Sequence, residues 1–396
     1  MEAVIRENKQ MSKYKIVMPI VLLAVLIGGV LLGKIYFGGS NEPNSNIFTT
    51  QQNNQDITDD RQNAITRVVS KASDCIVGIN VEEVKEVQNP FFDDPFFRQF
   101  FGESTPRTQV VRGLGSGFII SEDGYILTND HVAGNATKIS VTLTSGETVE
   151  AELIGKDPTT DVALLKINKK GLPFLRFANS DRVLIGEWAI ALGNPFGLFE
   201  INAKPTVTVG VVSATNMKVF SGQNRVYNDM IQTDASINSG NSGGPLLDAN
   251  GDVIGMNTII YTGGQFNQGS IGVGFAISIN RVKKIMEELK ANGKIDRSFN
   301  VGFRIQAVDD RIAEYLKLDK KKDYGAVVVQ LQPGGLSDRA GLKVEDVIIK
   351  VNDVQVKNDQ EVIFAINDMR VGDKLKLTVL RNGDEEEIEM ELERAN

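Results

Sequence analysis

Short runs of β-branched and aromatic residues, separated by glycine-containing turns, constrain the fold of this chain more than any other feature. The chain holds 38 glycines, and many of them stand between two such runs. Asp123-Gly124, for example, separates residues 117–120 from residues 125–128, which is typical of a β-hairpin. Further strand-like runs are 139–143, 148–154, 162–167, 188–192, 206–213, 245–247, 253–260 and 272–279. This pattern predicts a mainly β protein built as a barrel or sandwich.

The length of 396 residues exceeds what one ordinary core needs, so we expect two folded domains with extensions. The hydrophobic fraction of 41% is that of a globular protein. A net charge of -8 without long basic runs argues against nucleic acid as a partner. The single cysteine, Cys75, lies in an apolar run and is expected to be a buried structural thiol.

The N-terminal region predicts a membrane anchor. Residues 16–33 carry no charge over 18 positions, which is enough to cross the hydrocarbon core. Basic residues before this run favour a cytoplasmic segment 1–15 and a transmembrane signal anchor over 16–37. A cleaved signal peptide is the alternative, although no clear Ala-x-Ala site follows. Residues 38–63 are polar and predict a flexible linker that places the folded part outside the membrane.

Two folded units are expected after the linker, over residues 64–295 and 298–396. Asn280 could cap a helix that closes the first unit and stops at Gly293. The apolar face of this helix would consist of Val282, Ile285, Met286 and Leu289. At the end of the second unit, glutamates alternate with Ile388, Met390 and Leu392. These glutamates therefore indicate a solvated sheet face instead of a metal site.

The hexapeptide from Gly240 to Pro245, Gly-Asn-Ser-Gly-Gly-Pro, is the strongest motif for chemistry. A serine hydroxyl becomes a nucleophile when a base removes its proton and donors stabilise the resulting oxyanion. Glycines around Ser242 would let the loop turn tightly, so that the N–H groups of Gly240 and Ser242 converge on an oxyanion hole. The alternative is an ordinary Gly/Ser loop.

His131 is the only histidine in the chain, so any histidine chemistry must use it. It follows a strand-like run and is expected at a barrel rim. Asp161 follows a polar turn and begins an apolar run, where its carboxylate could hold the imidazole in one tautomer. Asp157 is a rival, but it precedes Pro158 and is expected to serve the turn. The order His131, Asp161, Ser242 is that of chymotrypsin-type barrels.

These motifs resemble the HtrA/Deg family of serine proteases from about residue 64 to the C-terminus. The matching segments are Gly113–Ile120, Tyr125–Val132, Asp157–Lys166, Ala191–Gly197, Gln232–Leu246 and Gly272–Ile277. The resemblance implies a chymotrypsin-like double β-barrel with the site between the barrels, followed by an α+β PDZ domain. It also implies a catalytic triad of His131, Asp161 and Ser242.

Two residues depart from the family pattern. Asp130 stands before the histidine where Asn or Ala is common, and Ser239 stands where Pro is common. A carboxylate beside His131 would raise the pKa of the imidazole if its side chain points inward.

The primary specificity pocket is predicted from the residue six before the nucleophile. This residue is Ser236, which carries no charge, so a preference for Lys or Arg is not expected. Ile237 resembles the family position that narrows the pocket toward Val, Ala and similar side chains.

Residues 89–103 hold six of the 19 phenylalanines. This segment could pack its own aromatic rings against the barrel, or it could dock on another subunit or gate the site. Both interpretations stay open at this point.

In the second unit, Gln332–Asp353 matches the central signature of a PDZ module. Val301, Gly302 and Phe303 are the candidate carboxylate-binding loop, whose N–H groups would capture a peptide C-terminus. Glu345 and Asp353 stand where the family often has Gly, which puts the turn geometry there in question.

The resemblance implies an ATP-independent endopeptidase that degrades misfolded or unfolded proteins at the outer face of the cytoplasmic membrane. No nucleotide loop or metal-ligand cluster appears in the sequence, and we expect no cofactor. A homotrimer or larger homo-oligomer is implied, with some chaperone-like holding activity. Alternatives are a peptide-activated stress sensor that makes one regulatory cut and a non-catalytic chaperone or scaffold.

Overall fold

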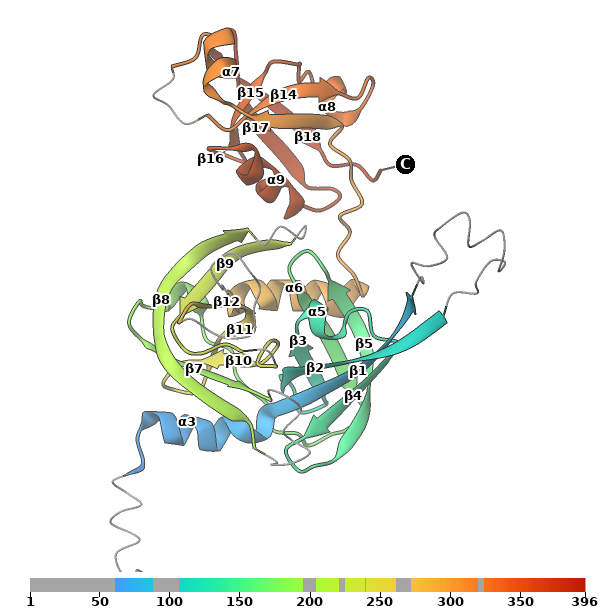
Figure 1. Ribbon diagram of the computed structural model, residues 1–396, viewed down its shortest axis with the longest axis vertical. Coiled ribbons are helices and arrows are strands. Elements are labelled where there is room, and N and C mark those ends of the chain that lie inside the picture. The colour runs from blue at the N-terminus through green and yellow to red at the C-terminus, as the bar shows by residue number, and fades with distance from the viewer. Residues whose placement is uncertain are drawn as a thin grey trace, which may run out of the picture. The chain divides into compact units, whose positions relative to one another are not determined.

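The computed structural model describes residues 61–87, 107–194, 204–220, 225–238, 240–260, 272–319 and 324–395 (Figure 1). The predicted anchor over 16–37, nearly all of the predicted linker, the segment 89–103 and Ser239 lie outside these ranges. Within them, no helix combines the length and apolar character needed to cross a membrane.

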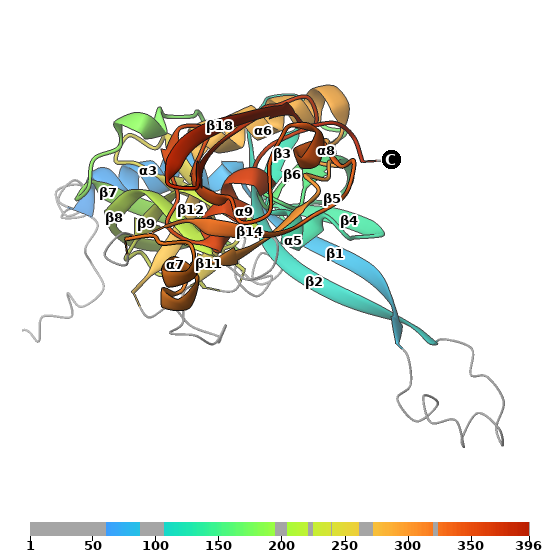
Figure 2. The same cartoon turned by 90° about the horizontal axis from the view of Figure 1, so that it is seen from above.

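The first barrel is formed by the order β1-β2-β3-β6-β5-β4, in which neighbouring strands are antiparallel. Its strands are β1 (Ile76–Val87), β2 (Arg107–Ile119), β3 (Tyr125–Thr128), β4 (Lys138–Leu143), β5 (Thr148–Asp157) and β6 (Val162–Ile167). Strands β1 and β2 stay paired from Ile76 opposite Phe118 to Val87 opposite Arg107, and this long ribbon leaves the barrel (Figure 2). Alternate residues such as Val77, Ile79 and Val141 fill the barrel interior.

The second barrel follows the order β10-β11-β12-β9-β8-β7. Its strands are β7 (Trp188–Gly193), β8 (Thr206–Phe220), β9 (Val226–Thr233), β10 (Pro245–Leu247), β11 (Val253–Ile260) and β12 (Gly274–Ser278). Small and branched side chains such as Ala191, Val212 and Ala276 fill its interior. Two closed barrels among the described strands confirm the predicted mainly β class and the double barrel.

Short helical segments surround the barrels, and one core joins them. These segments are α3 (Ala64–Ala72), η1 (Ser73–Cys75), α5 (Asp130–Ala133), η3 (Ser180–Arg182) and α6 (Ile279–Asn292). A large apolar cluster combines residues of α3 and α6 with Phe118 of the first barrel and Met230 of the second. Cys75 is buried, as expected, and burial followed by the charge of Asp74 raises the pKa of its thiol to about 11.

The predicted helix after the second barrel exists, but its predicted cap is wrong. Helix α6 begins at Ile279 after Ser278, so Asn280 lies inside its first turn. The N–H of Asn280 donates to the hydroxyl of Ser180 at 3.1 Å, which satisfies one of the free N–H groups at the helix start. The helix ends at Gly293 in the left-handed conformation (φ 72°), as predicted.

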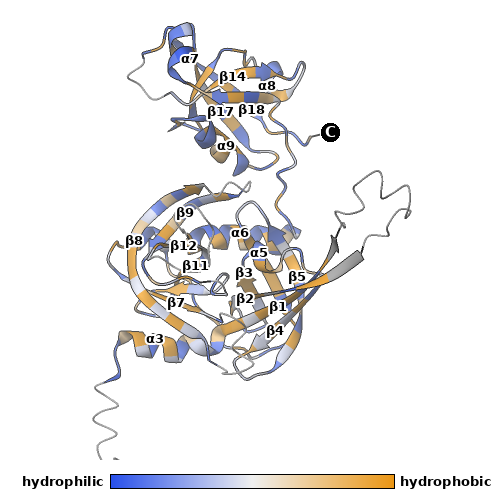
Figure 3. Cartoon of the chain, in the orientation of Figure 1, coloured by the Kyte–Doolittle hydropathy of each residue, from blue (hydrophilic) through white to orange (hydrophobic). Residues whose placement is uncertain are grey.

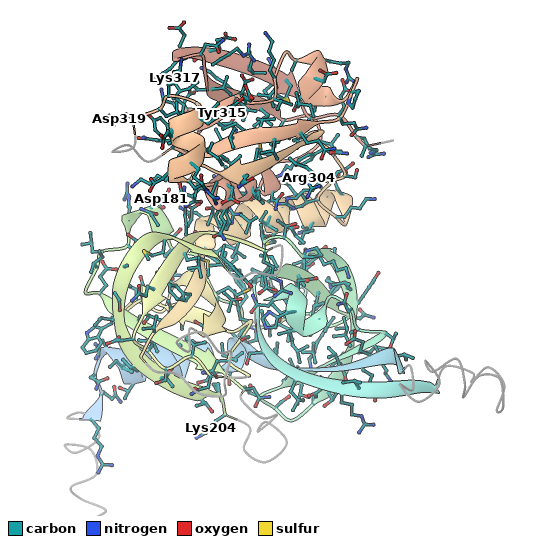
Figure 4. All side chains as sticks on the ribbon, turned by 45° about the horizontal axis from the view of Figure 1, so that its top comes forward. Asp181, Lys204, Arg304, Tyr315, Lys317 and Asp319 are labelled. Atoms are coloured by element: carbon teal, nitrogen blue, oxygen red, sulfur yellow. The ribbon has the colours of Figure 1, made fainter. Side chains whose placement is uncertain are left out.

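The second folded unit, over residues 298–396, is an α+β fold with the sheet order β13-β14-β15-β17-β18. Its strands are β13 (Phe303–Ala307), β14 (Ala326–Leu331), β15 (Val347–Val351), β16 (Val354–Gln355), β17 (Lys374–Arg381) and β18 (Asp384–Glu391). Its helices are α7 (Asp310–Tyr315), α8 (Leu336–Arg339) and α9 (Asp359–Asn367). Tyr315, Lys317 and Asp319 mark the surface at the end of α7 (Figure 4).

The predicted alternation along the last strand is confirmed. Ile388, Met390 and Leu392 are buried, whereas Glu387, Glu389 and Glu391 are exposed. Apolar and polar bands also follow one another along the long strand β8 (Figure 3).

Candidate active site

Asp161 lies at the start of β6, and its side chain is fully buried. Its φ of 61° is in the left-handed region, which Asp tolerates better than most residues. Its carboxylate accepts hydrogen bonds from the Oγ1 of Thr258 at 2.7 Å and from the hydroxyl of Tyr227 at 3.1 Å. It also accepts one from the backbone N–H of His131 at 3.0 Å. This carboxylate is therefore fixed from several directions.

His131 belongs to α5, the short helix that follows β3 at the rim of the first barrel. Its Nδ1 lies 2.8 Å from Oδ2 and 3.0 Å from Oδ1 of Asp161. A carboxylate only accepts hydrogen bonds, so Nδ1 carries the proton and Nε2 is left with a lone pair. Asn129 supports the arrangement, since its side-chain amide donates to the carbonyl of Asp161 at 2.9 Å. The imidazole is thereby held in the tautomer that can accept a proton.

Asp157, the rival carboxylate, serves the turn as expected. It accepts from the hydroxyl of Thr160 and the N–H of Thr159, and it pairs with Arg297 at 2.5 Å. None of these groups belongs to the candidate site.

Ser242 lies on the loop before β10, between Gly240 (φ 98°) and Gly243 (φ 84°). A Cβ at position 243 would stand 2.2 Å from the carbonyl oxygen of Ser116, so only glycine fits there. Ser242 and His131 line one cavity of about 310 Å³. The Ser242 hydroxyl, however, donates to the carbonyl of Thr258 at 3.0 Å, and no hydrogen bond joins it to His131 in the described structure.

Backbone N–H groups next to the nucleophile complete the candidate oxyanion hole. Those of Gly240 and Ser242 donate no hydrogen bond to any group within the described residues. They are therefore available as donors to a ligand. The residues predicted for the specificity pocket lie just upstream: Ser236 is half-buried, and Ile237 is fully buried against Gly274.

Ser116 on β2 is a residue of this site that the sequence analysis did not single out. Its hydroxyl donates to the carbonyl of Gly240 at 2.5 Å and accepts from the N–H of Asn194 at 2.7 Å. Its own N–H donates to the carbonyl of Ser242 at 3.0 Å. One buried serine of the first barrel thus fixes two carbonyls of the nucleophile loop in the second. Its position inside the family-like segment Gly113–Ile120 could have indicated it from the sequence.

Arg225 at the start of β9 was also missed. Its Nη1 lies 3.1 Å from Oδ1 of Asp161. Burial opposes ionisation of Asp161, but the hydrogen bond and charge of His131, the charge of Arg225 and the hydrogen bond of Thr258 together hold the pKa of this carboxyl below its ordinary value. Asp161 therefore stays ionised although it is buried.

The candidate carboxylate-binding loop of the second folded unit precedes and enters β13. Gly302 has a φ of 78°, and its N–H donates to Oδ1 of Asn300 at 2.9 Å. The carbonyl of Val301 accepts from the hydroxyl of Ser337 at 2.6 Å. A peptide carboxylate that uses the N–H of Gly302 would have to displace Asn300.

Glu345 and Asp353, which stand where the family often has Gly, both adopt the left-handed backbone conformation. Glu345 has a φ of 75° and Asp353 a φ of 64°. The turn geometry in question is therefore retained, at a strain cost of about 1 kcal/mol per residue.

Both folded parts of the chain are similar to known protein families. Residues 115–256 match the model of a trypsin-like peptidase domain, and residues 289–392 match that of a PDZ domain. A probable periplasmic DegP-like serine endoprotease of Chlamydia trachomatis is 45% identical over 309 residues, covering 75% of this chain and 58% of the relative. The corresponding protein of Marinomonas sp. is 38% identical, covering 83% of this chain and 71% of the relative. This chain thus spans little more than half the length of its chlamydial relatives.

Solved structures agree with these matches. The HtrA-type protease AlgW, solved with a decapeptide, is 35% identical with a TM-score of 0.64, covering 84% of this chain and 99% of that one. The serine endoprotease of Yersinia pestis is 29% identical with a TM-score of 0.55, covering 85% of this chain and 99% of that one. With its trypsin-like domain and single PDZ domain, the chain belongs to the HtrA/DegP-like family of serine proteases.

Proposed function

We propose that this protein is an ATP-independent serine endopeptidase that uses His131 as general base, Asp161 as its orienting carboxylate and Ser242 as nucleophile. The observation that carries the proposal is the imidazole of His131, which Asp161 holds through Nδ1 and which lines the same cavity as Ser242. The proposed domains are a protease over 64–295 and a PDZ domain over 298–396.

Catalysis begins when the Ser242 hydroxyl leaves the carbonyl of Thr258 and turns toward Nε2 of His131. His131 takes the hydroxyl proton while Oγ forms a bond to the carbonyl carbon of the peptide. The N–H groups of Gly240 and Ser242 stabilise the oxyanion. His131 then returns the proton to the leaving amine as the C–N bond breaks, and water releases the acyl group by the same steps.

Substrates are proposed to be misfolded or unfolded proteins outside the cytoplasmic membrane, with 16–37 as the anchor and 1–15 in the cytoplasm. The printed names of the bacterial relatives describe periplasmic endoproteases, which supports this location. By family resemblance the assembly is a homotrimer or a larger homo-oligomer.

The pocket residues Ser236 and Ile237 lead us to propose small aliphatic residues such as Val or Ala before the scissile bond. A library of unfolded peptides tests this preference. Cleavage mainly after Arg would refute it.

The decisive experiment for the proposed function is degradation of casein by the purified chain and by its Ser242→Ala variant, at two temperatures. We expect degradation by the parent and none above background by the variant. Equal degradation by both would sink the assignment and favour the non-catalytic chaperone or scaffold.

A peptide-activated sensor that makes one regulatory cut is the second candidate. It is favoured by the Ser242 hydroxyl, which rests on Thr258 instead of His131. The PDZ loop Val301, Gly302 and Phe303 would then receive the activating C-terminus. Activation by a C-terminal peptide, with little casein degradation in its absence, would favour the sensor over broad degradation.

A further inference from the structure

Two charged side chains from separate elements lie close to the buried carboxylate of the candidate triad. Arg225 comes from the start of β9, Asp130 from the first position of α5, and Asp161 from the start of β6. Arg225 Nη1 lies 3.1 Å from Oδ1 of Asp161, and its Nη2 lies 3.7 Å from Oδ2 of Asp130. One guanidinium therefore faces two carboxylates.

All three groups are largely removed from water. The exposed fraction of the side chain is 19% for Arg225, 6% for Asp130 and 0% for Asp161. Oδ1 of Asp130 has no hydrogen-bond partner within the described residues. A Cβ at Gly134 would stand 1.9 Å from this oxygen, so the glycine leaves room for the carboxylate. Charges in such a place interact more strongly than they would in water.

The ionisation of the three groups follows from this burial. Although burial opposes it, the charge of Asp161 and the hydrogen bond to Tyr227 raise the pKa of Arg225, which stays charged. Burial first and the charge of Asp161 second raise the pKa of Asp130, while Lys156 and Arg225 oppose that rise. Arg225 thus lowers the cost of holding Asp130 and Asp161 as neighbouring anions.

A cation against Asp161 has a cost for catalysis. The carboxylate must stabilise the imidazolium that forms when His131 takes the Ser242 proton, and the charge of Arg225 repels that imidazolium. Asp130 directly precedes His131 in the chain and carries the compensating negative charge.

We propose that Arg225 and Asp130 act as a coupled pair of positioning residues for the triad. Arg225 fixes the carboxylate of Asp161 in place, and Asp130 offsets the positive charge that Arg225 brings toward His131. This inference rests on the proposed function, because it assigns the two residues their roles in the same reaction.

Other charged and titratable groups lie near this cluster or line the adjacent cavity, and they stay unchanged in the test. Tyr227 of β9 donates to Asp161, and Lys156 of β5 donates to the carbonyl of Gly134 and to Asn135. Glu83 of β1 lines the cavity of His131 and Ser242. Because these groups are the same in all variants, differences between the pH profiles of the variants measure the effects of Arg225 and Asp130 alone.

The test is the pH dependence of kcat/KM on a peptide substrate, measured with the full chain and four variants. On the acidic side of the profile, kcat/KM falls as the base becomes protonated, and this part is called the acid limb. Its midpoint should move to higher pH in Arg225→Gln, which removes a cation, and to lower pH in Asp130→Asn, which removes an anion, each by about one pH unit. The double variant should return close to the parent. Arg225→Lys, which keeps the charge, should hold the parental midpoint even if kcat falls.

A purely structural role would lower kcat without moving the acid limb. Unchanged midpoints in active Arg225→Gln and Asp130→Asn variants, or shifts of both in the same direction, would overturn the inference. If Arg225→Gln does not fold, the direction of the shift in Asp130→Asn decides alone. Full activity of Ser242→Ala would instead overturn the proposed function, so the two failures are distinguishable.

Discussion

The two halves of the candidate site differ in how completely their reactive groups are prepared. On the first-barrel side, Asp161 is held by Thr258, Tyr227 and both the N–H and ring of His131. On the second-barrel side, the nucleophile loop is well anchored, but the Ser242 hydroxyl is bonded to Thr258 instead of to its base. The base is ready in this structure, and the nucleophile has still to turn toward it. Control of activity is therefore expected on the nucleophile side.

The largest loss of kcat is expected when the carboxylate that orients His131 is removed. Asp161→Asn removes the charge and lets the amide donate, which favours the wrong tautomer of His131. We expect kcat to fall about 10⁴-fold with KM little changed. Steady-state kinetics on a peptide substrate measure this, and a fall of less than about tenfold would show that Asp161 does not orient the base.

A smaller effect is expected from loosening the nucleophile loop. Ser116→Ala removes the hydrogen bonds to the Gly240 carbonyl and from the Asn194 N–H, so the oxyanion donors lose a fixed position. We expect kcat to fall roughly 10- to 100-fold.

Ser180→Ala is the matched control for this change. Its hydroxyl also accepts a backbone N–H, that of Asn280, but at the start of α6. It should leave kcat unchanged while lowering the melting temperature. Equal losses of kcat in both serine variants would mean that Ser116 acts through general stability.

Thr258 contributes to both halves, with its side chain on Asp161 and its carbonyl on Ser242. Thr258→Val removes only the side-chain donor and nearly keeps the shape. Because the hydroxyl of Tyr227, the N–H and ring of His131, and the guanidinium of Arg225 still hold Asp161, we expect a loss in kcat of about three- to tenfold. A loss as large as that of Asp161→Asn would show that the carboxylate is held by Thr258 alone.

The sequence predicted most strands of the two barrels, because turns such as Asp123-Gly124 separate one apolar run from the next. It indicated only the apolar start of β1 near Cys75 and only the end of β2, at residues 117–120. It did not indicate β9, where Asn228 and Asp229 interrupt the apolar pattern and Asp229 takes a positive φ of 55°. The triad was visible because each member stands inside a motif.

The partners of the triad were not visible from the sequence. Arg225 and Thr258 stand 64 and 97 residues from Asp161, and only the closure of the second barrel brings them to it. Their roles depend on long-range packing, which no local pattern records. The segments that resemble the family include neither Arg225 nor Thr258, so the resemblance did not indicate them either.

The smallest expected effect is on the free energy of unfolding, through the buried carboxylate of Asp130 beside the base. Burial and the charge of Asp161 raise the pKa of Asp130 above its unfolded value, so its ionised form destabilises the fold at neutral pH. This cost disappears as the pH falls below the folded pKa. Asp130→Asn should therefore unfold at a higher urea concentration than the parent at pH 7, and the difference should shrink toward about pH 4.

Asp157→Asn is the control, since that buried carboxylate has Thr159, Thr160 and Arg297 as partners. It should lower the urea midpoint at pH 7. A lower urea midpoint in both variants would contradict the conclusion that the ionised carboxylate of Asp130 destabilises the fold.

Ser242 is proposed to be a nucleophile that His131 activates. The most direct measurement is the rate of covalent labelling by a fluorophosphonate, with the modified residue located by mass spectrometry. We expect labelling of Ser242 in the parent, none in Ser242→Ala, and a rate at least about 10³-fold lower in His131→Ala. Labelling of Ser242 at the parental rate in His131→Ala, or a label on another residue, would contradict it.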